Sequence, residues 1–369
     1  MKILVTGAKG FVGRNLCLTL QQMPDVEVLK YDLGDEPKLE GYLTECDFVM
    51  HLAGVNRPKD PAEFKTGNTV FTEDILEKLA ARQNPPSVLL SSSIQAALDN
   101  DYGKSKAAAE DAVRAYGEKT GAPVFIYRLA NVFGKWCRPN YNSAVATWVY
   151  NIARDLPIMV RDPAATVTLV YVDDVVRSFI GHLNNAERQP GILSVLPSYT
   201  KTLGEITDLI RSFHDEPMNL MVPDQQDGFT KKLYSTYLAA LPEDKFSYPL
   251  TMHCDNRGSF TEALRSVERG QVSVNVSKPG IAKGQHWHHT KHEKFLVVSG
   301  KGEINFRMAD DPKGKIITYK VSGEKLEVVR IPPGYTHNIV NVGDTDMVTV
   351  MWANEVFDPA NPDTFRLEV

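Results

Sequence analysis

The feature that most restricts the fold is a change in the pattern of apolar residues along the chain. Up to about residue 180, apolar runs alternate with amphipathic stretches of mixed three- and four-residue spacing. Such alternation predicts strands that alternate with helices, and therefore an α/β fold with a doubly wound parallel sheet. From about Tyr248 onward, short β-rich runs are separated by Gly, Pro and Asp turns, which predicts an all-β sandwich or barrel.

The apolar runs of the N-terminal part locate the predicted strands. They lie at residues 2–7, 26–32, 46–54, 87–93 and 123–134. Two helical segments, 203–215 and 229–241, precede the change of sequence pattern, and residues 241–251 are typical of a linker. We therefore expect an α/β domain over residues 1–245 and a β domain over residues 246–369.

Composition narrows the class of protein. With 43% hydrophobic and 24% charged residues, the chain has ordinary globular values, and a net charge of −5 argues against a nucleic-acid partner. No apolar run approaches the roughly 18 residues that span a bilayer. The four cysteines lie far apart without a CxxC pair, which is typical of a reducing compartment. The N-terminal MKILVTGAKG predicts a strand and a glycine turn rather than a signal peptide, so we expect a soluble, cytoplasmic protein without a membrane partner.

The segment TGAKGFVG, residues 6–13, carries three glycines between an apolar strand and an amphipathic helix. They are Gly7, Gly10 and Gly13. Glycine lets the backbone turn tightly and approach a pyrophosphate at the helix N-terminus. Asp32 ends the second predicted strand and suits a ribose hydroxyl. Lys30 and Arg14 could instead compensate a 2′-phosphate, so NAD and NADP both remain open, and Arg14 equally suits a solvated helix position.

A tyrosine and a lysine, Tyr102 and Lys106, are spaced to share one face of a helix. A tyrosine of pKa about 10 is a poor proton donor near neutrality. The ammonium, together with an oxidised nicotinamide, would lower that pKa by favouring the phenolate. The pair follows a serine-ended apolar run, residues 89–93, and a serine hydroxyl there can hydrogen-bond the same carbonyl oxygen.

Several motifs together resemble the extended short-chain dehydrogenase/reductase family. They are TGAKGFVG (6–13), HLAGVN (51–56), Asn68, SSS (91–93), YGKSKAAAE (102–110), RLANVFG (128–134) and YVDDVV (171–176). The resemblance covers about residues 1–240 and implies a Rossmann fold, a nicotinamide cofactor and a nucleotide-sugar substrate. The chain departs from many members in having only eight residues between Ser93 and Tyr102, and IQAAL follows the serines.

The resemblance also implies roles for individual residues. Tyr102 is the proton donor, Lys106 orients it, and Ser93 is the hydroxyl partner, with Ser92 as the alternative register. The implied cofactor-binding residues are Gly7, Gly10, Phe11, Val12, Gly13, Arg14, Asp32, Leu52, Ala53, Tyr102 and Lys106. The implied substrate-binding residues are Asn131, Arg138 and Arg161, because arginine suits bidentate contact with a diphosphate, although each also suits an ordinary exposed loop.

Four of the nine histidines fall between residues 286 and 292. His286 and His288 are two apart, so on a strand they point to the same face. Glu293 follows, and His337 comes after a Pro-Gly turn. Three imidazoles and a carboxylate that converge inside a barrel would form a four-ligand site for zinc or another divalent ion. The other two histidines of the segment are predicted to lie in a solvated turn.

The spacing of these residues resembles the two cupin motifs over about residues 250–369, with Leu326 where a glycine usually begins the second motif. DNRGSFTEAL (255–264), VSVNVSKPGIAKGQH (272–286) and IPPGYTH (331–337) are similar to the 4-keto-sugar 3,5-epimerase branch of the cupins. In that branch the histidine at the position of His286 abstracts a proton and no metal is needed. One lone pair cannot serve both roles, and we favour metal ligation because four positions match.

The two halves together resemble bifunctional capsular-polysaccharide enzymes. That resemblance implies epimerisation at C3 of a UDP-4-keto-6-deoxy-N-acetylhexosamine and reduction of its C4 ketone with NADPH. The implied product is UDP-2-acetamido-2,6-dideoxy-β-L-talose, on the UDP-N-acetyl-L-fucosamine pathway. Two alternatives stay open: a single-function reductase whose cupin binds sugar or dimerises, and a redox sensor that binds NADPH without turnover. We expect a homodimer.

Overall fold

The computed structural model describes residues 1–58, 60, 62–184 and 190–369. The chain forms two compact units, residues 1–210 with 232–242 and residues 211–231 with 243–369. The sequence predicts a single boundary at residue 245. In the structure, the segment 211–231 also belongs to the second unit, so the chain passes from one unit to the other three times.

The first unit is built on a six-stranded parallel sheet with the order β2-β1-β3-β4-β5-β8. Its strands are β1 (Lys2–Thr6), β2 (Glu27–Tyr31), β3 (Phe48–His51), β4 (Ser87–Ser93), β5 (Val124–Leu129) and β8 (Gly191–Leu193). The chain reverses its direction of travel across the sheet between β1 and β3, and ligands of such sheets bind at the carboxyl ends beside this point. The doubly wound α/β fold predicted from the sequence is confirmed.

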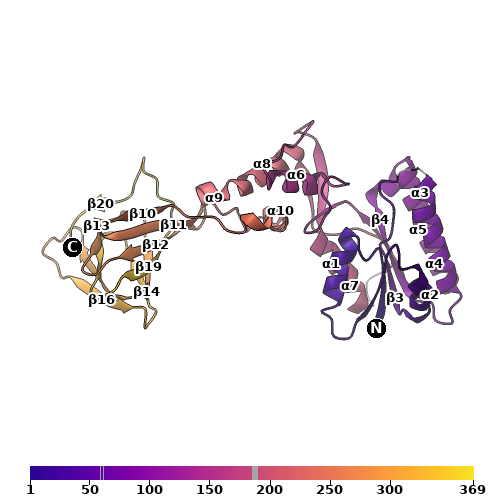
Figure 1. The fold of residues 1–369 in the computed structure, drawn as a ribbon, viewed down its shortest axis with the longest axis horizontal. Coiled ribbons are helices and arrows are strands. Elements are labelled where there is room, and N and C mark those ends of the chain that lie inside the picture. Colours follow the sequence, from indigo (N-terminus) through magenta and orange to yellow (C-terminus); the bar gives the residue numbers. More distant parts are fainter. Residues whose placement is uncertain (59, 61, 185–189) are drawn as a thin grey trace. The chain divides into compact units, whose positions relative to one another are not determined.

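Helices cover both faces of this sheet, with α1 and α7 on one side and α2, α4 and α5 on the other (Figure 1). The helices of this region are α1 (Phe11–Leu20), α2 (Glu36–Glu45), α3 (Ala62–Phe64), the π-helical η1 (Lys65–Val70), α4 (Phe71–Ala80), the 3-10 helix η2 (Ile94–Ala97), α5 (Asp101–Thr120), α6 (Ala144–Ile152) and α7 (Val172–Asn184). A strand covered on both faces needs apolar side chains on both, which explains the continuous apolar runs in the sequence.

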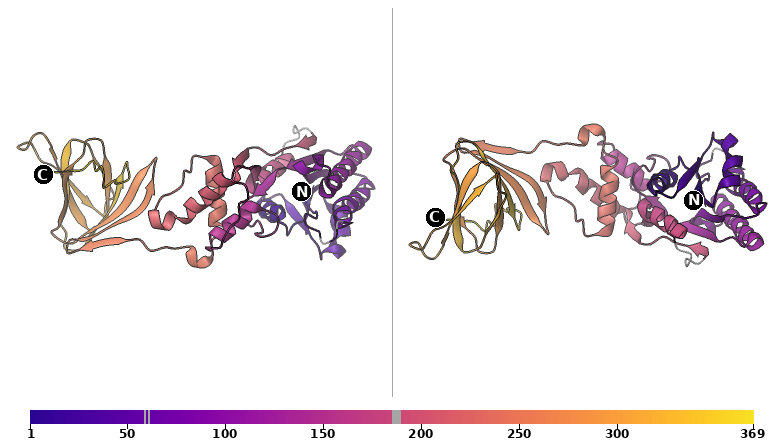
Figure 2. Two further views of the ribbon diagram at one scale, coloured as in Figure 1. Left: turned by 90° about the horizontal axis from the view of Figure 1, so that it is seen from above. Right: turned by 90° about the horizontal axis from the view of Figure 1, so that it is seen from below.

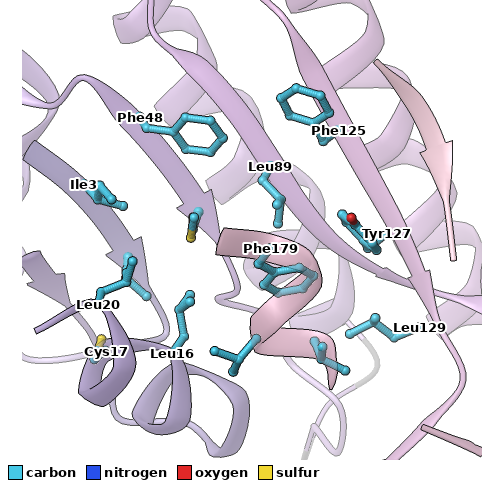
Figure 3. Packing of buried hydrophobic residues seen from close by; sticks show 14 of the residues in the cluster. Ile3, Leu16, Cys17, Leu20, Phe48, Leu89, Phe125, Tyr127, Leu129 and Phe179 are labelled. Carbon is cyan, nitrogen blue, oxygen red and sulfur yellow. The ribbon is translucent and has the colours of Figure 1, made fainter. Parts of the chain in front are cut away.

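One of the two cores lies between the sheet and helices α1 and α7 (Figure 3). Leu16 and Leu20 of α1 and Phe179 of α7 are fully buried in it. They pack with Leu89 of β4 and Tyr127 of β5, so the helix that follows the glycine turn is held against the sheet. This packing places the N-terminus of α1 at the carboxyl end of β1.

A smaller sheet and further helices complete the first unit. The sheet has the order β6-β7-β9, with β6 and β7 parallel and β7 and β9 antiparallel. Its strands are β6 (Asn131–Phe133), β7 (Thr166–Tyr171) and β9 (Ser198–Thr202). Helices α8 (Leu203–His214) and α10 (Gly228–Leu238) contain the residues at which the chain leaves and re-enters this unit.

The second unit consists of two antiparallel sheets that face one another (Figure 2). The sheet orders are β10-β11-β12-β19-β14-β17 and β16-β15-β18-β13-β20. The elements are α9 (Glu216–Asn219), η3 (Glu243–Lys245), β10 (Met252–Asp255), β11 (Gly258–Ser266), β12 (Gly270–Ser277), β13 (Ala282–Trp287), β14 (Glu293–Ser299), β15 (Lys301–Met308), β16 (Ile317–Ser322), β17 (Val328–Ile331), β18 (Tyr335–Asn341), β19 (Met347–Ala353) and β20 (Phe365–Arg366). The predicted all-β, cupin-like domain is confirmed.

Backbone hydrogen bonds tie the segment 211–231 to this second unit. The amide of Arg265 donates to the carbonyl of Leu220 (2.7 Å), and the amide of Val222 donates to the carbonyl of Arg265 (2.8 Å). Met221 therefore forms an isolated parallel β-bridge with Arg265, beside the end of β11. No helix within the described ranges is both long and apolar enough to cross a membrane.

Candidate active sites in the two units

The glycine turn follows β1 and leads into α1. Gly7 has φ +69°, and a Cβ added there would lie 2.8 Å from the amide nitrogen of Ala53. A Cβ on Gly13 would lie 2.1 Å from the carbonyl oxygen of Gly7. Glycine is therefore required at both positions. Helix α1 begins at Phe11 after Gly10, and the first amides of a helix have no intrahelical partner, so this end suits a pyrophosphate.

The carboxylate of Asp32 closes the turn from the side of β2. It accepts hydrogen bonds from the amides of Lys9 (2.6 Å) and Leu33 (2.9 Å). The guanidinium of Arg14 lies 5.2 Å from the ring centroid of Trp136. Asp32 thus lies where the sequence predicts a ribose contact, while Arg14 packs on an indole at the surface.

The remaining predicted cofactor residues lie around the same edge of the sheet. The amides of Leu52 and Ala53, at the end of β3, both donate to the hydroxyl of Thr6 (3.2 Å each). Phe11 and Val12 form the first turn of α1, and Val12 packs against the core. The residues at the ends of β1 and β3 therefore form one continuous wall beside the glycine turn.

Helix α5 carries the predicted catalytic pair. The side chain of Asn100 caps the helix by accepting from the amide of Gly103 (2.8 Å). Tyr102 and Lys106 lie one turn apart, with the ammonium 6.0 Å from the centre of the tyrosine ring. The ammonium also donates to the carbonyl of Ser91 (3.2 Å), which anchors it to the end of β4.

The three serines at the end of β4 take different directions. Neighbouring residues of a strand point to opposite faces. Ser93 hydrogen-bonds the hydroxyl of Tyr102, whereas Ser92 donates to the buried carboxylate of Glu110 (2.6 Å). The geometry thus pairs the tyrosine with Ser93, and Ser92 is occupied by Glu110. Burial raises the pKa of Tyr102, and the hydrogen bond from Ser93 offsets this only in part, so the net shift is opposite to the lowering expected from Lys106 and an oxidised nicotinamide.

An ion pair between buried Glu110 and half-buried Arg128 lies beside Lys106. Burial lowers the pKa of Lys106 to about 8, and the negative charge of Glu110 limits that drop. Glu110 is 0% exposed, and Arg128 donates to both of its carboxylate oxygens (2.9 and 2.7 Å). Sequence reasoning missed Glu110, although its position four residues after Lys106 on one helix is a readable signal.

The predicted substrate residues are only partly brought together. The side-chain amide of Asn131 donates to a backbone carbonyl of β7 (3.2 Å). The guanidinium of Arg138 lies 5.0 Å from the ring centroid of Tyr141, and that of Arg57 lies 6.0 Å from the same ring. Arg161 is exposed in the bend that follows α6. Arg57, missed in the sequence, thus joins Arg138 at one aromatic ring.

In the second unit, four side chains converge inside the barrel. One potential ligand atom each of His286, His288, Glu293 and His337 lies within 4.8 Å of all the others. His286 on β13 pairs directly with His337 on β18, and Glu293 begins β14 in the facing sheet. The carboxylate Oε2 lies 3.6 Å from Nε2 of His288 and 3.4 Å from Nε2 of His337.

These atoms are short of hydrogen bonds. Within the described part of the chain, Nε2 of His288, Nε2 of His337 and Oε2 of Glu293 are buried without a hydrogen-bond partner. An unsatisfied buried polar atom costs about 1–3 kcal/mol. Three imidazole nitrogens and one carboxylate oxygen are a ligand set that zinc accepts, so the residues fit a divalent cation. Nδ1 of His288 hydrogen-bonds the carbonyl of Asp363 (2.5 Å), which leaves Nε2 to face the cluster.

The electrostatics of the cluster agree with a cation site. Burial raises the pKa of Glu293, but the imidazoles of His288 and His337 and the ammonium of Lys291 lower it by more, so the carboxylate stays charged. Burial, followed by the neighbouring His337, lowers the pKa of His286 to about 4. His286 is therefore neutral at neutral pH and keeps a free lone pair.

The other two histidines of the segment lie outside this cluster. His289 and His292 are exposed, in the turn between β13 and β14. The carboxylate of Asp363 shapes that turn by accepting from the backbone amides of residues 289, 290 and 291 (2.8, 2.7 and 2.8 Å). The turn therefore presents these two imidazoles outward.

Fold and first site together define a Rossmann-type enzyme of the short-chain reductase class. Residues 3–195 match the NAD dependent epimerase/dehydratase family, and residues 253–365 match the polysaccharide biosynthesis C-terminal domain. The chain belongs to the NAD dependent epimerase/dehydratase family. It is a close homologue of the capsular polysaccharide assembling protein CapF and of a UDP-hexulose reductase.

The similarity to these two proteins extends over the whole chain. UDP-2-acetamido-2,6-beta-L-arabino-hexul-4-ose reductase from Pseudomonas aeruginosa is 47% identical over 100% of this chain and 99% of its own length. The crystal structure of CapF from Staphylococcus aureus is 51% identical, covers 100% of both chains and superposes with a TM-score of 0.92. UDP-glucuronic acid 4-epimerase from Bacillus cereus, 22% identical with a TM-score of 0.52 over 57% of this chain and 83% of its own, shares the fold of the first domain.

Proposed function

We propose that the chain is a bifunctional nucleotide-sugar enzyme. Its domain over residues 246–369 would epimerise C3 of a UDP-4-keto-6-deoxy-N-acetylhexosamine, and its domain over residues 1–245 would reduce the C4 ketone with NADPH. The product would be UDP-2-acetamido-2,6-dideoxy-β-L-talose, on the route to UDP-N-acetyl-L-fucosamine in capsule synthesis. The observation that carries this proposal is that one chain holds both a ketone-reducing Ser–Tyr–Lys set and a histidine cluster inside a cupin-like barrel.

The reduction assigns one task to each residue of the first site. Bound NADPH would supply the hydride. Tyr102 donates its phenolic proton to the C4 oxygen, and Ser93 hydrogen-bonds the same oxygen. Lys106 stabilises the phenolate that results, because its ammonium lies 6.0 Å from the ring. Reduction is supported further by the name of the Pseudomonas aeruginosa relative, a 4-ulose reductase.

Ketone chemistry explains why an epimerase and a reductase would share a chain. A ketone acidifies its α-carbon, because the negative charge left by the proton spreads into an enolate. Epimerisation at C3 beside a C4 ketone is freely reversible. Reduction of the ketone removes that acidity and traps the new configuration.

We assign His286, His288, Glu293 and His337 to one Zn²⁺ ion. The ion would offset the charge of Glu293 and join strands β13, β14 and β18. Four protein ligands are typical of a structural zinc site, whereas a catalytic site usually keeps one position for water or substrate. The unpartnered buried atoms of three of these residues support ligation. This assignment gives His286 to the metal rather than to proton abstraction.

Hydrogen exchange tests the epimerase. The full-length protein is incubated with the UDP-4-keto-6-deoxy-N-acetylhexosamine in deuterated water without NADPH, and NMR follows C3. We expect deuterium at C3. Failure to exchange would remove the epimerase activity and favour a single-function reductase with a sugar-binding or dimerising barrel.

Cofactor oxidation tests the reductase. Adding the same keto-sugar to enzyme and NADPH should consume NADPH, with NADH oxidised more slowly. Stable NADPH in the presence of keto-sugar would favour a redox sensor. We also propose a homodimer, for which light scattering of the purified protein should give twice the chain mass of 41.1 kDa.

A further inference from the structure

The second unit contains a cavity of about 240 Å³ on the inner face of its six-stranded sheet. Directly paired residues of neighbouring strands share a face. Gln271 pairs with Ala353, and Ala353 pairs with Glu293, while Ser273 pairs with Glu262. These side chains come from four adjacent strands and line one wall. Because Glu293 belongs to this wall, the cavity adjoins the histidine cluster.

The wall of this cavity contains buried polar side chains, and the interior beyond it includes an apolar core. Farther along the same interior, buried Phe295, Val297 and Ile304 form the core. In the cavity wall, Gln271 is 6% and Ser273 is 2% exposed. Oε1 of Gln271 accepts a hydrogen bond from the backbone amide of Phe357 (2.9 Å). A few placed polar groups in such a wall are suited to orient a polar ligand.

Aromatic side chains complete the cavity. Phe260 and Phe357 line it together with the polar residues. Apolar and aromatic walls with a few placed polar groups are typical of small-molecule sites. A volume of about 240 Å³ lies below the ~300–1,000 Å³ common for drug-sized ligands. The cavity therefore suits a single sugar ring rather than a whole nucleotide sugar.

Lys291 is the one lysine among the residues that line the cavity. Its side chain is 11% exposed, and Nζ lies 3.6 Å from Oε1 of Glu293 and 5.9 Å from the ring centroid of Phe357. Among the described residues, the ammonium has no hydrogen-bond partner, although it carries three donors. A largely buried ammonium with unused donors is poised to bind an acceptor oxygen of a ligand.

The two oxygens of Glu293 separate the cavity from the histidine cluster. Oε1 faces the ammonium of Lys291, and Oε2 faces the imidazoles of His288 and His337. The four-residue cluster already offers a full tetrahedral ligand set, so a ligand oxygen in the cavity has the ammonium of Lys291 as the cation of the described lining.

We propose that this cavity binds the keto-sugar ring of the epimerase and that Lys291 holds its C4 oxygen. The inference rests on the proposed epimerase function. In the step, the C3–H bond breaks and its electron pair forms the C3=C4 bond. The carbonyl π pair moves onto the oxygen, where the ammonium stabilises it, and the proton passes to the carboxylate of Glu262, which lines the same wall, and exchanges with water. Return of a proton to the opposite face of C3 gives the epimer.

The test compares three variants of the full-length protein in the deuterium exchange at C3. Removing one stabiliser of an oxyanion typically slows a reaction by about 10²–10³-fold. Lys291→Met should lower the kcat of exchange by this factor while changing KM far less. Lys291→Arg keeps a cation and should retain exchange to within about tenfold of wild type. The matched control is Lys294→Met, because Lys294 on the outer face is exposed over Trp352.

Metal content and melting temperature are measured for each variant, so that loss of the fold is recognised. If Lys291→Met does not fold, Lys291→Gln takes its place. Exchange at the wild-type rate in either folded neutral variant overturns the role of Lys291 and leaves the epimerase function standing. Absence of exchange in the wild type itself removes the epimerase function, and the inference with it.

Discussion

The two candidate sites hold their buried charges in opposite ways. In the first unit, the carboxylate of Glu110 accepts from Ser92 and from both arms of Arg128 at 2.6–2.9 Å. In the second, the carboxylate of Glu293 has its nearest cationic or imidazole nitrogens at 3.4–3.6 Å. Hydrogen bonds of this kind are normally about 2.7–3.2 Å long.

The difference shows what each site requires from outside the chain. The protein alone satisfies the charges behind Tyr102 and Lys106, so the geometry of the reductase set is built into the fold. The barrel cluster is spaced too widely for its members to satisfy one another, which is the spacing expected of ligands around a cation. Substitutions in the two sites should therefore have separable effects.

Tyr102→Phe is expected to show the largest difference between its effects on the two activities. This change removes the proton donor but keeps the ring, Ser93 and Lys106. We expect NADPH-dependent reduction to fall by about 10²–10⁴-fold. Exchange of deuterium at C3 should be unchanged, because it belongs to the other unit. Absorbance of NADPH and NMR of C3 measure the two activities, and parallel loss of both would contradict two independent sites.

The next largest effect is expected for Glu110→Gln. The side chain of Arg128 is 32% exposed and stays partly hydrated, so losing the charge of its buried partner should cost about 1–3 kcal/mol of stability. Chemical denaturation measures this loss. Glu118→Gln, an exposed change on the same helix, is the matched control and should be near neutral. Equal stability of the two variants would mean that the buried pair is dispensable.

Glu110→Gln should also shift the pH dependence of reduction. Burial lowers the pKa of Lys106 from 10.5 to about 8, and Glu110 counteracts the drop. The unfolded chain therefore binds more protons than the folded one between about 8 and 10.5, and stability from this group rises with pH across that window. Without Glu110 the pKa falls further, so a profile of kcat/KM should lose activity at lower pH than in the wild type.

A smaller loss, confined to the second unit, is expected for His288→Ala. Changes in residues that merely orient a ligand cost about 10–100-fold in metal affinity, so loss of a ligand should weaken zinc binding by about 100-fold or more. His292→Ala, an exposed histidine in the same segment, is the control. Elemental analysis measures metal content, and reduction by the first unit should persist. Wild-type metal content in His288→Ala would argue against the four-ligand assignment.

The smallest effect is expected for Trp136→Ala. The ring supports the guanidinium of Arg14 at 5.2 Å and is 40% exposed. Exposed cation–π contacts contribute about 0.5–1 kcal/mol. Denaturation should detect no more than this, with NADPH affinity changed only slightly. A tenfold loss of NADPH affinity would instead place Arg14 at the cofactor.

Periodic features of the sequence predict the fold and the gathering of the barrel cluster well. The apolar runs contain β1 to β5 because strands covered on both faces need them. His286 and His288 share a strand face by their spacing, and the motif that follows the Pro-Gly turn brings His337 to the same place. In these cases the signal is local, and the fold only has to bring together elements that each segment already specifies.

Long-range contacts explain what the sequence did not predict. Lys291 stands in a polar run with exposed histidines, so its segment reads as a solvated turn. The turn buries it because the carboxylate of Asp363, 72 residues farther along, accepts from its backbone amide. No local pattern records that contact. Glu110 differs, because its spacing from Lys106 could have been read from the helix.

The segment 211–231, which belongs to the second unit but precedes the rest of it in the chain, has a consequence for how the protein folds after synthesis. Leu220 and Val222 hydrogen-bond Arg265, which the ribosome adds more than forty residues later. The segment must therefore wait, after synthesis, for β11 before its backbone is satisfied. A gene fragment that encodes only residues 246–369 would omit it and leave the edge of β11 open. A cut at a single codon therefore cannot divide the chain into its two compact units.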